Sequence, residues 1–319
     1  MSSIGPNVYV VGSIAYDDLE TPSGTRDSLL GGSAVYFSIA GSIFSKMGMI
    51  GTVGYDFRDK DISLLNQKKI DTSKIEKKKD GSTFRWKGNY SKDFEDPITI
   101  STSLGVFEEF SPKIDKEVEN SSFIFLANIS PDIQRNIATN LTNSNKIVGL
   151  DTMNHWIIEM KQSLLEVMKN VDIFFINKGE ALLLSNKKSI EESAKYIIEN
   201  GPKLCIIKDG KNGSYLYSIN GEEFYCPTYD IDKVVDPTGA GDSFAGGFFG
   251  YISKIERPAL EDFKNAMLYG SAIASFTIEG FGTESLFNMN FQSLNERFEK
   301  IKSKKDLREK WNMTSKILI

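Results

Sequence analysis

Short apolar runs alternate with amphipathic stretches along most of this chain of 319 residues, and this alternation constrains the fold more than any other feature. Strands that alternate with helices form βαβ units, in which helices cover both faces of a mostly parallel sheet. The sequence therefore predicts an α/β fold. The strand-like runs are Val8–Gly12, Met49–Val53, Phe123–Ile129, Ile147–Asp151, Val171–Ile176 and Leu204–Lys208. The helix-like stretches between them include Ser130–Asn140, Trp156–Asn170 and Ser189–Asn200.

One segment, from Ser82 to Phe107, breaks this pattern because its apolar residues recur at every second position. Such a period predicts antiparallel strands with one buried face. A short antiparallel sheet inserted into a parallel α/β chain is a candidate lid or a candidate contact between subunits, and the alternative is an extension that only completes the core. The apolar residues that alternate are Phe84, Trp86, Tyr90, Ile98, Ile100, Leu104 and Val106.

The charge balance and the cysteine count narrow the classes of partner and compartment. The 43 acidic residues outnumber the 38 Lys and Arg residues, and the resulting charge of −5 argues against a general nucleic-acid binder. No apolar run approaches the length of about 18 residues that a membrane span needs, and no signal peptide is expected. Two cysteines, Cys205 and Cys226, make no disulfide framework, which favours a reducing, cytoplasmic compartment.

A single histidine, His155, limits the chemistry further. A metal site with several histidines is excluded, and a Ser-His-Asp or Cys-His mechanism would depend on this residue alone. Its surroundings, Asp-Thr-Met-Asn-His-Trp, contain neither an HExxH nor a G-x-S-x-G pattern, so we interpret it as a residue of a loop or helix start. Chemistry in this chain must rest on carboxylates, amides, backbone groups or lysines.

The most informative stretch is the glycine-rich run 236–248. We call its first part, residues 236–242, the glycine loop. We expect a short strand Lys233–Val235 before it and a helix after it that continues to about Ile252. The first N–H groups of a helix have no partner within the helix, the helix dipole adds positive charge there, and glycines let an anion approach closely. This combination predicts a phosphate site.

Three glycines inside the expected helix, Gly246, Gly247 and Gly250, support close packing at this place. Each of them costs about 1 kcal/mol of helix propensity relative to alanine. A helix that tolerates all three is expected to lie tightly against a neighbour, which is either another element or a nucleotide.

Asp242 carries a carboxylate beside the expected phosphate site. A carboxylate would repel a phosphate, but it is suited to take the proton from a hydroxyl group that attacks phosphorus. The amides of Gly239, Ala240 and Gly241 would then stabilise the charge on the transferred group. The alternative is that Asp242 only caps the helix.

The stretch Asp-Pro-Thr-Gly-Ala-Gly-Asp-Ser-Phe, residues 236–244, closely resembles the C-terminal signature of the pfkB (ribokinase-like) family of carbohydrate and nucleoside kinases. The resemblance extends over nearly the whole chain. It implies a ribokinase-like three-layer sandwich, one kinase domain over residues 1–319, and a small antiparallel β lid formed by segments at about 13–30 and 81–107. The other motifs that resemble the family are Gly12–Asp17, Gly31–Ala34, Gly51–Asp56, Asn177–Glu180 and Gly280–Gly282.

The resemblance also implies an activity, the ATP-dependent transfer of the γ-phosphoryl group to a hydroxyl of a sugar or sugar-like acceptor. It assigns the role of base to Asp242 and that of anion hole to residues 239–241, and it leaves open a homodimer that forms through the lid. The acceptor would be held by Asp17, Gly31, Gly32 and Ser33. The nucleotide would be held by Asn177, Lys208, Gly210 and Gly282. Metal ligands would be Glu180 and Asn177 for Mg²⁺, through water, and Asp236 for a monovalent cation such as K⁺.

Two departures from the family pattern fall on the acceptor side. Tyr36 stands near the place where many sugar kinases of the family have an asparagine, and Ser33 replaces the lysine of ribokinases. Because a Gly-Gly-Ser sequence also occurs among adenosine kinases, a nucleoside kinase is the first alternative. A non-catalytic ligand-binding relative is the second, and the intact Asp242 argues against it. The absence of G-x-G-x-x-G after Val11 disfavours a dinucleotide-dependent dehydrogenase, and a P-loop kinase is excluded because the sequence lacks G-x-x-x-x-G-K-[ST].

Overall fold

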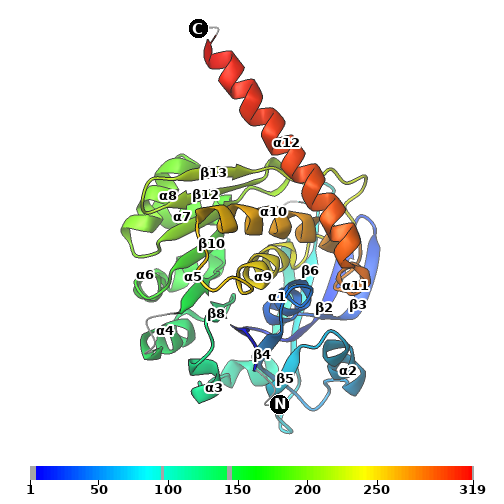
Figure 1. Cartoon of the computed structure of the whole chain (residues 1–319). Helices are drawn as coiled ribbons and strands as arrows, with labels where there is room; N and C mark the ends of the chain where they lie inside the picture. The colour runs from blue at the N-terminus through cyan, green and yellow to red at the C-terminus, as the bar shows by residue number, and fades with distance from the viewer. Residues whose placement is uncertain (1–4, 95–96, 142–145, 318–319) are drawn as a thin grey trace.

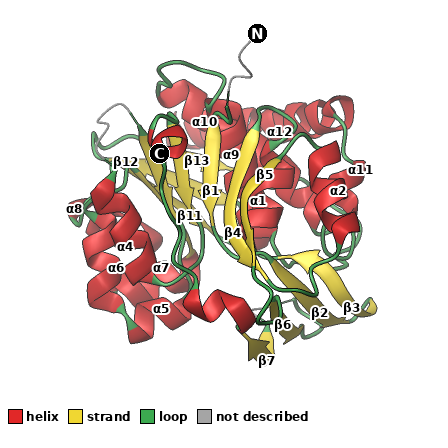
Figure 2. Ribbon diagram, turned by 90° about the horizontal axis from the view of Figure 1, so that it is seen from below, coloured by secondary structure: helices red, strands yellow, loops and turns green. Residues whose placement is uncertain are grey.

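The computed structural model describes residues 5–94, 97–141 and 146–317, with side chains up to residue 305. Within these residues, a nine-stranded sheet in the order β13-β12-β11-β10-β9-β8-β1-β4-β5 forms the centre of the molecule (Figure 2). Its neighbouring strands are parallel, except that β12 is antiparallel to both β11 and β13. This confirms the mostly parallel sheet. Its strands are β1 Val8–Val11, β4 Met47–Val53, β5 Asp71–Lys77, β8 Phe123–Leu126, β9 Ile147–Leu150, β10 Ile173–Asn177, β11 Leu204–Lys208, β12 Ser214–Ser218 and β13 Glu223–Cys226.

Helices cover both faces of this sheet and complete the three-layer sandwich (Figures 1 and 2). Successive residues of a strand point to opposite faces, and in β8 Phe125 belongs to one buried cluster while Ile124 and Leu126 belong to the other. One layer contains α1 Ser33–Gly41, α9 Ala240–Ile252, α10 Leu260–Thr277, α11 Glu284–Asn288 and α12 Phe291–Ile317, whose end extends beyond the body (Figure 1). The other contains α4 Pro131–Asn140, α5 Asn154–Glu159, α6 Lys161–Met168, α7 Lys178–Ser185 and α8 Ile190–Glu199.

Two expected elements differ from the structure. The helix expected over Trp156–Asn170 is two helices, α5 and α6, because the backbone leaves the helical region at Met160 (φ −134°, ψ 34°). The strand expected at Lys233–Val235 is wrong. This segment is a loop, and the Val235 N–H donates to the carbonyl oxygen of Ile278 (2.8 Å) instead of joining a sheet.

A separate four-stranded sheet, in the order β3-β2-β6-β7, lies at the carboxyl ends of the large sheet's central strands (Figure 2). Its β2–β3 and β6–β7 pairs are antiparallel, and β2 runs parallel to β6. The expectation of one buried face is wrong for β7, all of whose residues are exposed, including Ile98 at 70% and Ile100 at 49%. Dimerisation through this edge stays a prediction. The strands are β2 Ala15–Thr21, β3 Gly24–Gly31, β6 Phe84–Asn89 and β7 Ile98–Ser103.

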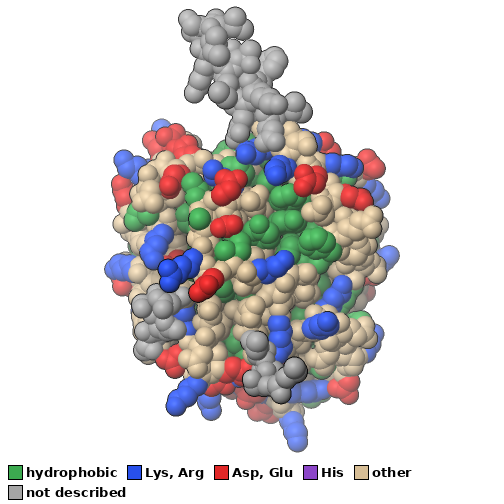
Figure 3. Space-filling model, in the orientation of Figure 1, with side chains coloured by type: hydrophobic (Ala, Val, Ile, Leu, Met, Phe, Trp, Pro, Cys, Tyr) green, Lys and Arg blue, Asp and Glu red, His purple; other side chains and the backbone are tan. Residues whose placement is uncertain are grey.

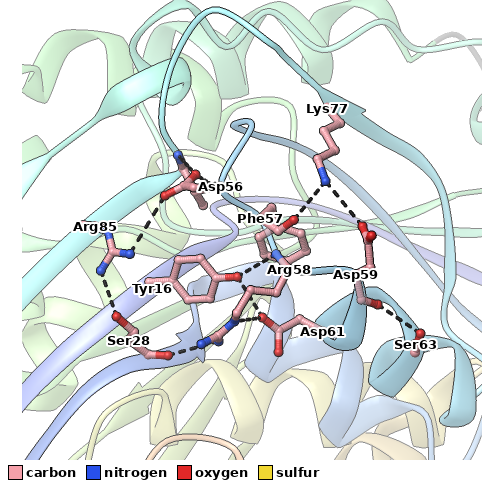
Figure 4. A network of polar contacts seen from close by, with 11 residues as sticks. Tyr16, Ser28, Asp56, Phe57, Arg58, Asp59, Asp61, Ser63, Lys77 and Arg85 are labelled. Atoms are coloured by element: carbon pink, nitrogen blue, oxygen red, sulfur yellow. Dashed lines mark hydrogen bonds and ion pairs between the residues drawn. The ribbon is translucent and has the colours of Figure 1, made fainter.

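A network around Tyr16 fixes the small sheet to the main body at α2 (Asp59–Gln67) (Figure 4). The Tyr16 ring lies between two guanidinium groups, 4.2 Å from that of Arg58 and 5.2 Å from that of Arg85. Its hydroxyl donates to Asp61 (2.8 Å), and Arg58 and Arg85 donate to the carbonyl and hydroxyl oxygens of Ser28 (3.0 Å each). The small sheet is therefore held to the main body at the start of α2.

Two surface properties bear on the expected partners. No helix in the described part of the chain combines the length and the apolar character that crossing a membrane requires. On the face shown in Figure 3, basic and acidic side chains are interspersed, as the near balance of 38 basic and 43 acidic residues leads one to expect. This face offers no continuous basic surface of the kind that binds nucleic acid.

Candidate active site

The glycine loop enters α9 through a left-handed turn at Gly239, which is the N-cap of α9 and has φ +72°. The carboxylate of Asp236 holds the loop, since it accepts hydrogen bonds from the N–H of Thr238 (2.9 Å) and from that of Gly282 (2.8 Å). Asp236 is fully buried. The structure thus gives Asp236 and Gly282 a shared part in shaping the loop, and it leaves Asp242 at the third residue of α9.

Three of the glycines of α9, those at positions 246, 247 and 250, pack against other helices. A Cβ atom on Gly246 would lie 2.1 Å from the carbonyl oxygen of Phe37, and one on Gly250 would lie 2.6 Å from that of Gly41, both in α1. A Cβ atom on Gly247 would lie 2.6 Å from Ile273 in α10. Of the two neighbours that the sequence left open, the structure therefore supplies another element, and this close contact brings the start of α1 beside the start of α9.

The residues expected on the acceptor side meet at the start of α1. The Asp17 carboxylate lies directly over Gly31, because a Cβ atom there would be 1.9 Å from the Asp17 Oδ2. Gly32, the N-cap of α1, has φ +94°, and a Cβ atom on it would lie 2.5 Å from the carbonyl oxygen of Ser13. The hydroxyl of Ser33 accepts from the N–H of Ser13 (3.1 Å), so it is engaged in holding this turn. The structure brings Asp17 and the two glycines together and gives Ser33 a structural contact.

Two carboxyl groups from other elements influence the Asp17 carboxyl across this space. Burial raises the pKa of Asp17 to about 8, and the negative charges of Asp236 and Asp242 add to the increase. Burial likewise raises the pKa of Asp242 to about 7, with a further increase from Asp151 that Lys208 opposes. Groups with strongly shifted pKa values gather at functional sites. The expected acceptor side and the glycine loop therefore face the same region.

A lysine–carboxylate pair completes the glycine-loop side. The Lys208 Nζ lies 3.3 Å from the Asp151 Oδ2, and a Cβ atom on Gly241 would lie only 2.9 Å from this Nζ. Burial acts to lower the pKa of Lys208, but Asp151, Glu180 and Asp242 more than offset it and leave the pKa raised. A charged ammonium group therefore lies against the glycine loop, where an anion would be neutralised.

Asp151 is a site residue that we did not predict. It directly follows β9, and the strands β10 and β11 beside it end at Asn177 and Lys208, which are partners in register. Ligands of parallel sheets lie outside the carboxyl ends of the strands. An acidic residue at the end of an apolar run was therefore the signal that marked Asp151.

Asn177 and Glu180 form a capping box at the start of α7. The Asn177 Oδ1 accepts from the Glu180 N–H (2.8 Å), and the Glu180 carboxylate accepts from the Asn177 N–H (2.9 Å). Carboxylate and amide oxygens suit Mg²⁺, which keeps several waters and needs few protein ligands. These two residues fit contact through water, and the described residues contain no cluster of three or more His, Cys, Asp or Glu side chains that would hold a metal directly.

The two remaining glycines expected at the nucleotide differ in setting. Gly210 follows β11 in an exposed turn, has φ +50°, and has no atom within 4 Å of a Cβ built on it. Gly282 is buried, has φ +56°, and a Cβ atom on it would lie 3.3 Å from Leu29 of the small sheet. Gly282 is therefore tied both to the glycine loop and to β3, while Gly210 stands apart from them.

The small sheet reaches the glycine loop through side chains that the sequence pattern did not single out for contact. The hydroxyl of Tyr90, just after β6, lies 3.1 Å from that of Thr238. At the same end of the sheet, in β3, the guanidinium of Arg26 lies 4.6 Å from the centre of the Phe281 ring. These contacts hold the small sheet against the glycine loop and against the segment 280–282.

Comparison with known proteins identifies the class as phosphotransferases that act on a hydroxyl group. Residues 9–288 match the family model described as "pfkB family carbohydrate kinase". The chain belongs to the pfkB family of carbohydrate kinases. This confirms the family resemblance that the motifs carried.

Two curated relatives align over most of the chain. The cytidine kinase of Thermococcus kodakarensis is 26% identical over 251 residues, which are 78% of this chain and 89% of that protein. The nucleoside kinase of Methanothermobacter thermautotrophicus is 26% identical over 282 residues, which are 81% of each protein. Among solved structures, the nucleoside kinase of Methanocaldococcus jannaschii is similar, with a TM-score of 0.74 and 24% identity, and covers 93% of this chain and 99% of its own. This last likeness confirms the ribokinase-like fold.

Proposed function

We propose that the protein is an ATP-dependent kinase that transfers the γ-phosphoryl group to a hydroxyl of a sugar or of the sugar part of a nucleoside. The observation that carries the proposal is the Asp242 carboxyl, which stands beside the left-handed turn at Gly239 and has a pKa raised to about 7. A carboxylate with a pKa near neutrality is suited to accept a proton at physiological pH.

Each residue of the site has a part in this transfer. Asp17 accepts hydrogen bonds from acceptor hydroxyls and orients them, and Asp242 takes the proton of the hydroxyl that attacks phosphorus. The amides of residues 239–241 and the ammonium of Lys208 stabilise the negative charge of the transferred group, which is the main requirement of phosphoryl transfer. Asp151 holds Lys208 in place.

Mg²⁺ would be held by Asn177 and Glu180 through water, and when bound it neutralises charge on the β- and γ-phosphates. ATP and Mg²⁺ are supported by the similar structure of a ribokinase II from E. coli in complex with both, which has a TM-score of 0.75. The likeness itself, at 20% identity, shows the shared fold, and the binding of ATP and Mg²⁺ by this chain is our proposal. A monovalent cation at Asp236 stays a prediction.

A nucleoside is the acceptor that the relatives favour. Two relatives that align with about four fifths of the chain are named cytidine kinase and nucleoside kinase, whereas the ribokinase of Staphylococcus aureus aligns with 38% of it. The Ser33 hydroxyl accepts a hydrogen bond from the N–H of Ser13. Unlike the lysine that ribokinases have at this place, it carries no charge that could bind a free sugar. We therefore place nucleosides first in the experiment below.

A screen for acceptor-dependent release of ADP from ATP tests the proposed function. The screen compares cytidine and other nucleosides with free sugars, sugar phosphates and inositols at a fixed concentration of Mg²⁺. We expect one acceptor class to stimulate ADP release well above the rate without acceptor, and a phosphorylated product of the matching mass. Failure of every class to stimulate release or to yield such a product would contradict a kinase acting on these acceptors.

Replacing Asp151 with asparagine should move the acidic limb of the pH–rate profile to lower pH. The base must be unprotonated to act, so activity falls as the pH falls through the pKa of Asp242, near 7 in the wild type. Because the negative charge of Asp151 raises that pKa, its removal lowers it and extends activity to more acidic solution. The measurement is kcat/KM between about pH 5 and 9.

A matched lysine–aspartate pair at the amino ends of the strands of the same sheet provides the control. Asp172 and Lys203 precede β10 and β11 and form an ion pair of 2.7 Å. Asp172→Asn should leave the acidic limb where it is in the wild type. An acidic limb that stays in place, or moves to higher pH, in Asp151→Asn would refute the assigned coupling between Asp151 and Asp242.

A further inference from the structure

A buried hydroxyl group without a hydrogen-bond partner lies at the candidate site. It belongs to Tyr36 of α1, whose side chain is 1% exposed. Among the described residues, the Tyr36 hydroxyl oxygen is one of a small number of buried polar side-chain atoms that no hydrogen bond satisfies. Leaving a buried polar group unpaired is costly, and native proteins rarely do so without a reason.

The position of the ring is fixed by the glycine loop. A Cβ atom on Gly239 would lie 2.2–2.4 Å from three carbons of the Tyr36 ring, so the ring lies flat against the N-cap of α9. Tyr36 is also three residues after the start of α1, where Gly31 and Gly32 turn toward Asp17. The side chain therefore connects the acceptor side of the site with the anion-binding side.

The surroundings of the hydroxyl are acidic. Burial raises the pKa of Tyr36 well above its usual value, and the neighbouring groups that raise it further are Asp17, Asp236, Tyr90 and Asp242. The phenol therefore keeps its proton, and its hydroxyl group needs an acceptor to which it can donate a hydrogen bond. None of these neighbours accepts one from it, and Tyr90 is itself paired with Thr238. The described residues therefore provide no hydrogen-bond acceptor for the Tyr36 hydroxyl.

We propose that Tyr36 determines the specificity of the acceptor site by donating a hydrogen bond to an acceptor oxygen next to the hydroxyl that Asp17 holds. This proposal rests on the proposed function. A site built to bond a hydroxyl discriminates against an analogue that lacks it, because the site's own polar group is then left unpaired. The ring's contact with Gly239 also sets the distance between the bound acceptor and the glycine loop.

Steady-state kinetics on Tyr36→Phe with deoxy analogues test the proposal. The probes are the preferred acceptor of the screen and each of its monodeoxy forms, which for cytidine are the 2′-deoxy and 3′-deoxy compounds. In the wild type, one monodeoxy form should have a kcat/KM lower by about tenfold or more. In Tyr36→Phe, the parent acceptor should lose about tenfold in kcat/KM through KM, the penalty for that monodeoxy form should disappear, and the KM for ATP should not change.

The thermal stability of the free protein separates this role from a structural one. Tyr36→Phe removes a hydroxyl that the free protein leaves unpaired, so its melting temperature should equal or exceed that of the wild type. Tyr9→Phe, a change at an equally buried tyrosine in the amino-terminal half of β1, is the control and should leave the ratio of parent to monodeoxy acceptor unchanged.

The outcomes distinguish the proposal from the function on which it rests. If the wild type phosphorylates an acceptor but Tyr36→Phe retains the discrimination among monodeoxy forms, the role of Tyr36 is refuted and the kinase stands. A lower melting temperature of Tyr36→Phe without acceptor would also refute it, since the hydroxyl would then have a partner within the protein. If no acceptor is phosphorylated, the proposed function fails, and the proposal fails with it.

Discussion

Asp242→Asn should reduce phosphoryl transfer by about 10³-fold or more while the protein still binds ATP. An amide has no affinity for the proton of the attacking hydroxyl, and a positioned general base contributes about 10²–10⁴-fold to such a reaction. The loss should appear in kcat, because Asp242 is proposed to act on the reacting hydroxyl and the backbone amides of residues 239–241 are unchanged. The measurements are kcat with the preferred acceptor and the dissociation constant of a non-hydrolysable ATP analogue.

The matched control tests the alternative in which Asp242 only caps its helix. Asp242 is the third residue of α9, and Asp262 is the third residue of α10, where its carboxylate accepts from the N–H of Ala259 (2.9 Å). Asp262→Asn removes the same charge from the first turn of a neighbouring helix and should cost about 0.3–1 kcal/mol of stability without loss of turnover. Near-normal turnover of Asp242→Asn would rule out its role as the base.

The fold could be predicted from the sequence because buried strands and left-handed turns produce local patterns of residue types. Both faces of β8 are covered, so Phe123–Leu126 is apolar throughout, and a left-handed turn at Gly239 is favourable only with glycine. Local patterns failed where the outcome depended on what packs from afar. The alternation in β7 was correct as a strand signal, but no element covers its apolar residues within the described chain, and Ile98 is 70% exposed.

The parts of the candidate site that the sequence missed are contacts between distant segments. Asp151 ends an apolar run, but its contact with Lys208, which lies 57 positions away in the sequence and 3.3 Å away in space, is visible only in the structure. Tyr90 meets Thr238 across 148 positions. Neither pair has a spacing that a single sequence reveals, whereas Asp242 and its glycines are consecutive and were predicted with their roles.

The contact between Gly239 and Tyr36 leaves no room for a side chain at position 239. Gly239→Ala should lower kcat by about 10²-fold or more and destabilise the fold. A residue with a Cβ atom pays about 1–2 kcal/mol for the left-handed conformation that φ +72° requires. Its Cβ would also lie 2.2 Å from the buried Tyr36 ring, and a packed interior does not yield to such an overlap without displacement. A shift of about 1 Å in the groups that bind the phosphoryl group is enough for a loss of this size.

A second left-handed glycine separates the two causes. Gly221, between β12 and β13, has φ +83° and no atom within 4 Å of a Cβ built on it. Gly221→Ala should therefore lose stability through the backbone alone and keep the wild-type kcat. In a Tyr36→Ala background the added methyl at position 239 has room, so the further loss of stability on Gly239→Ala should shrink toward that of Gly221→Ala. Equal stability losses from Gly239→Ala in the wild-type and Tyr36→Ala backgrounds would show that the ring does not confine the loop, and the catalytic defect would then need another cause.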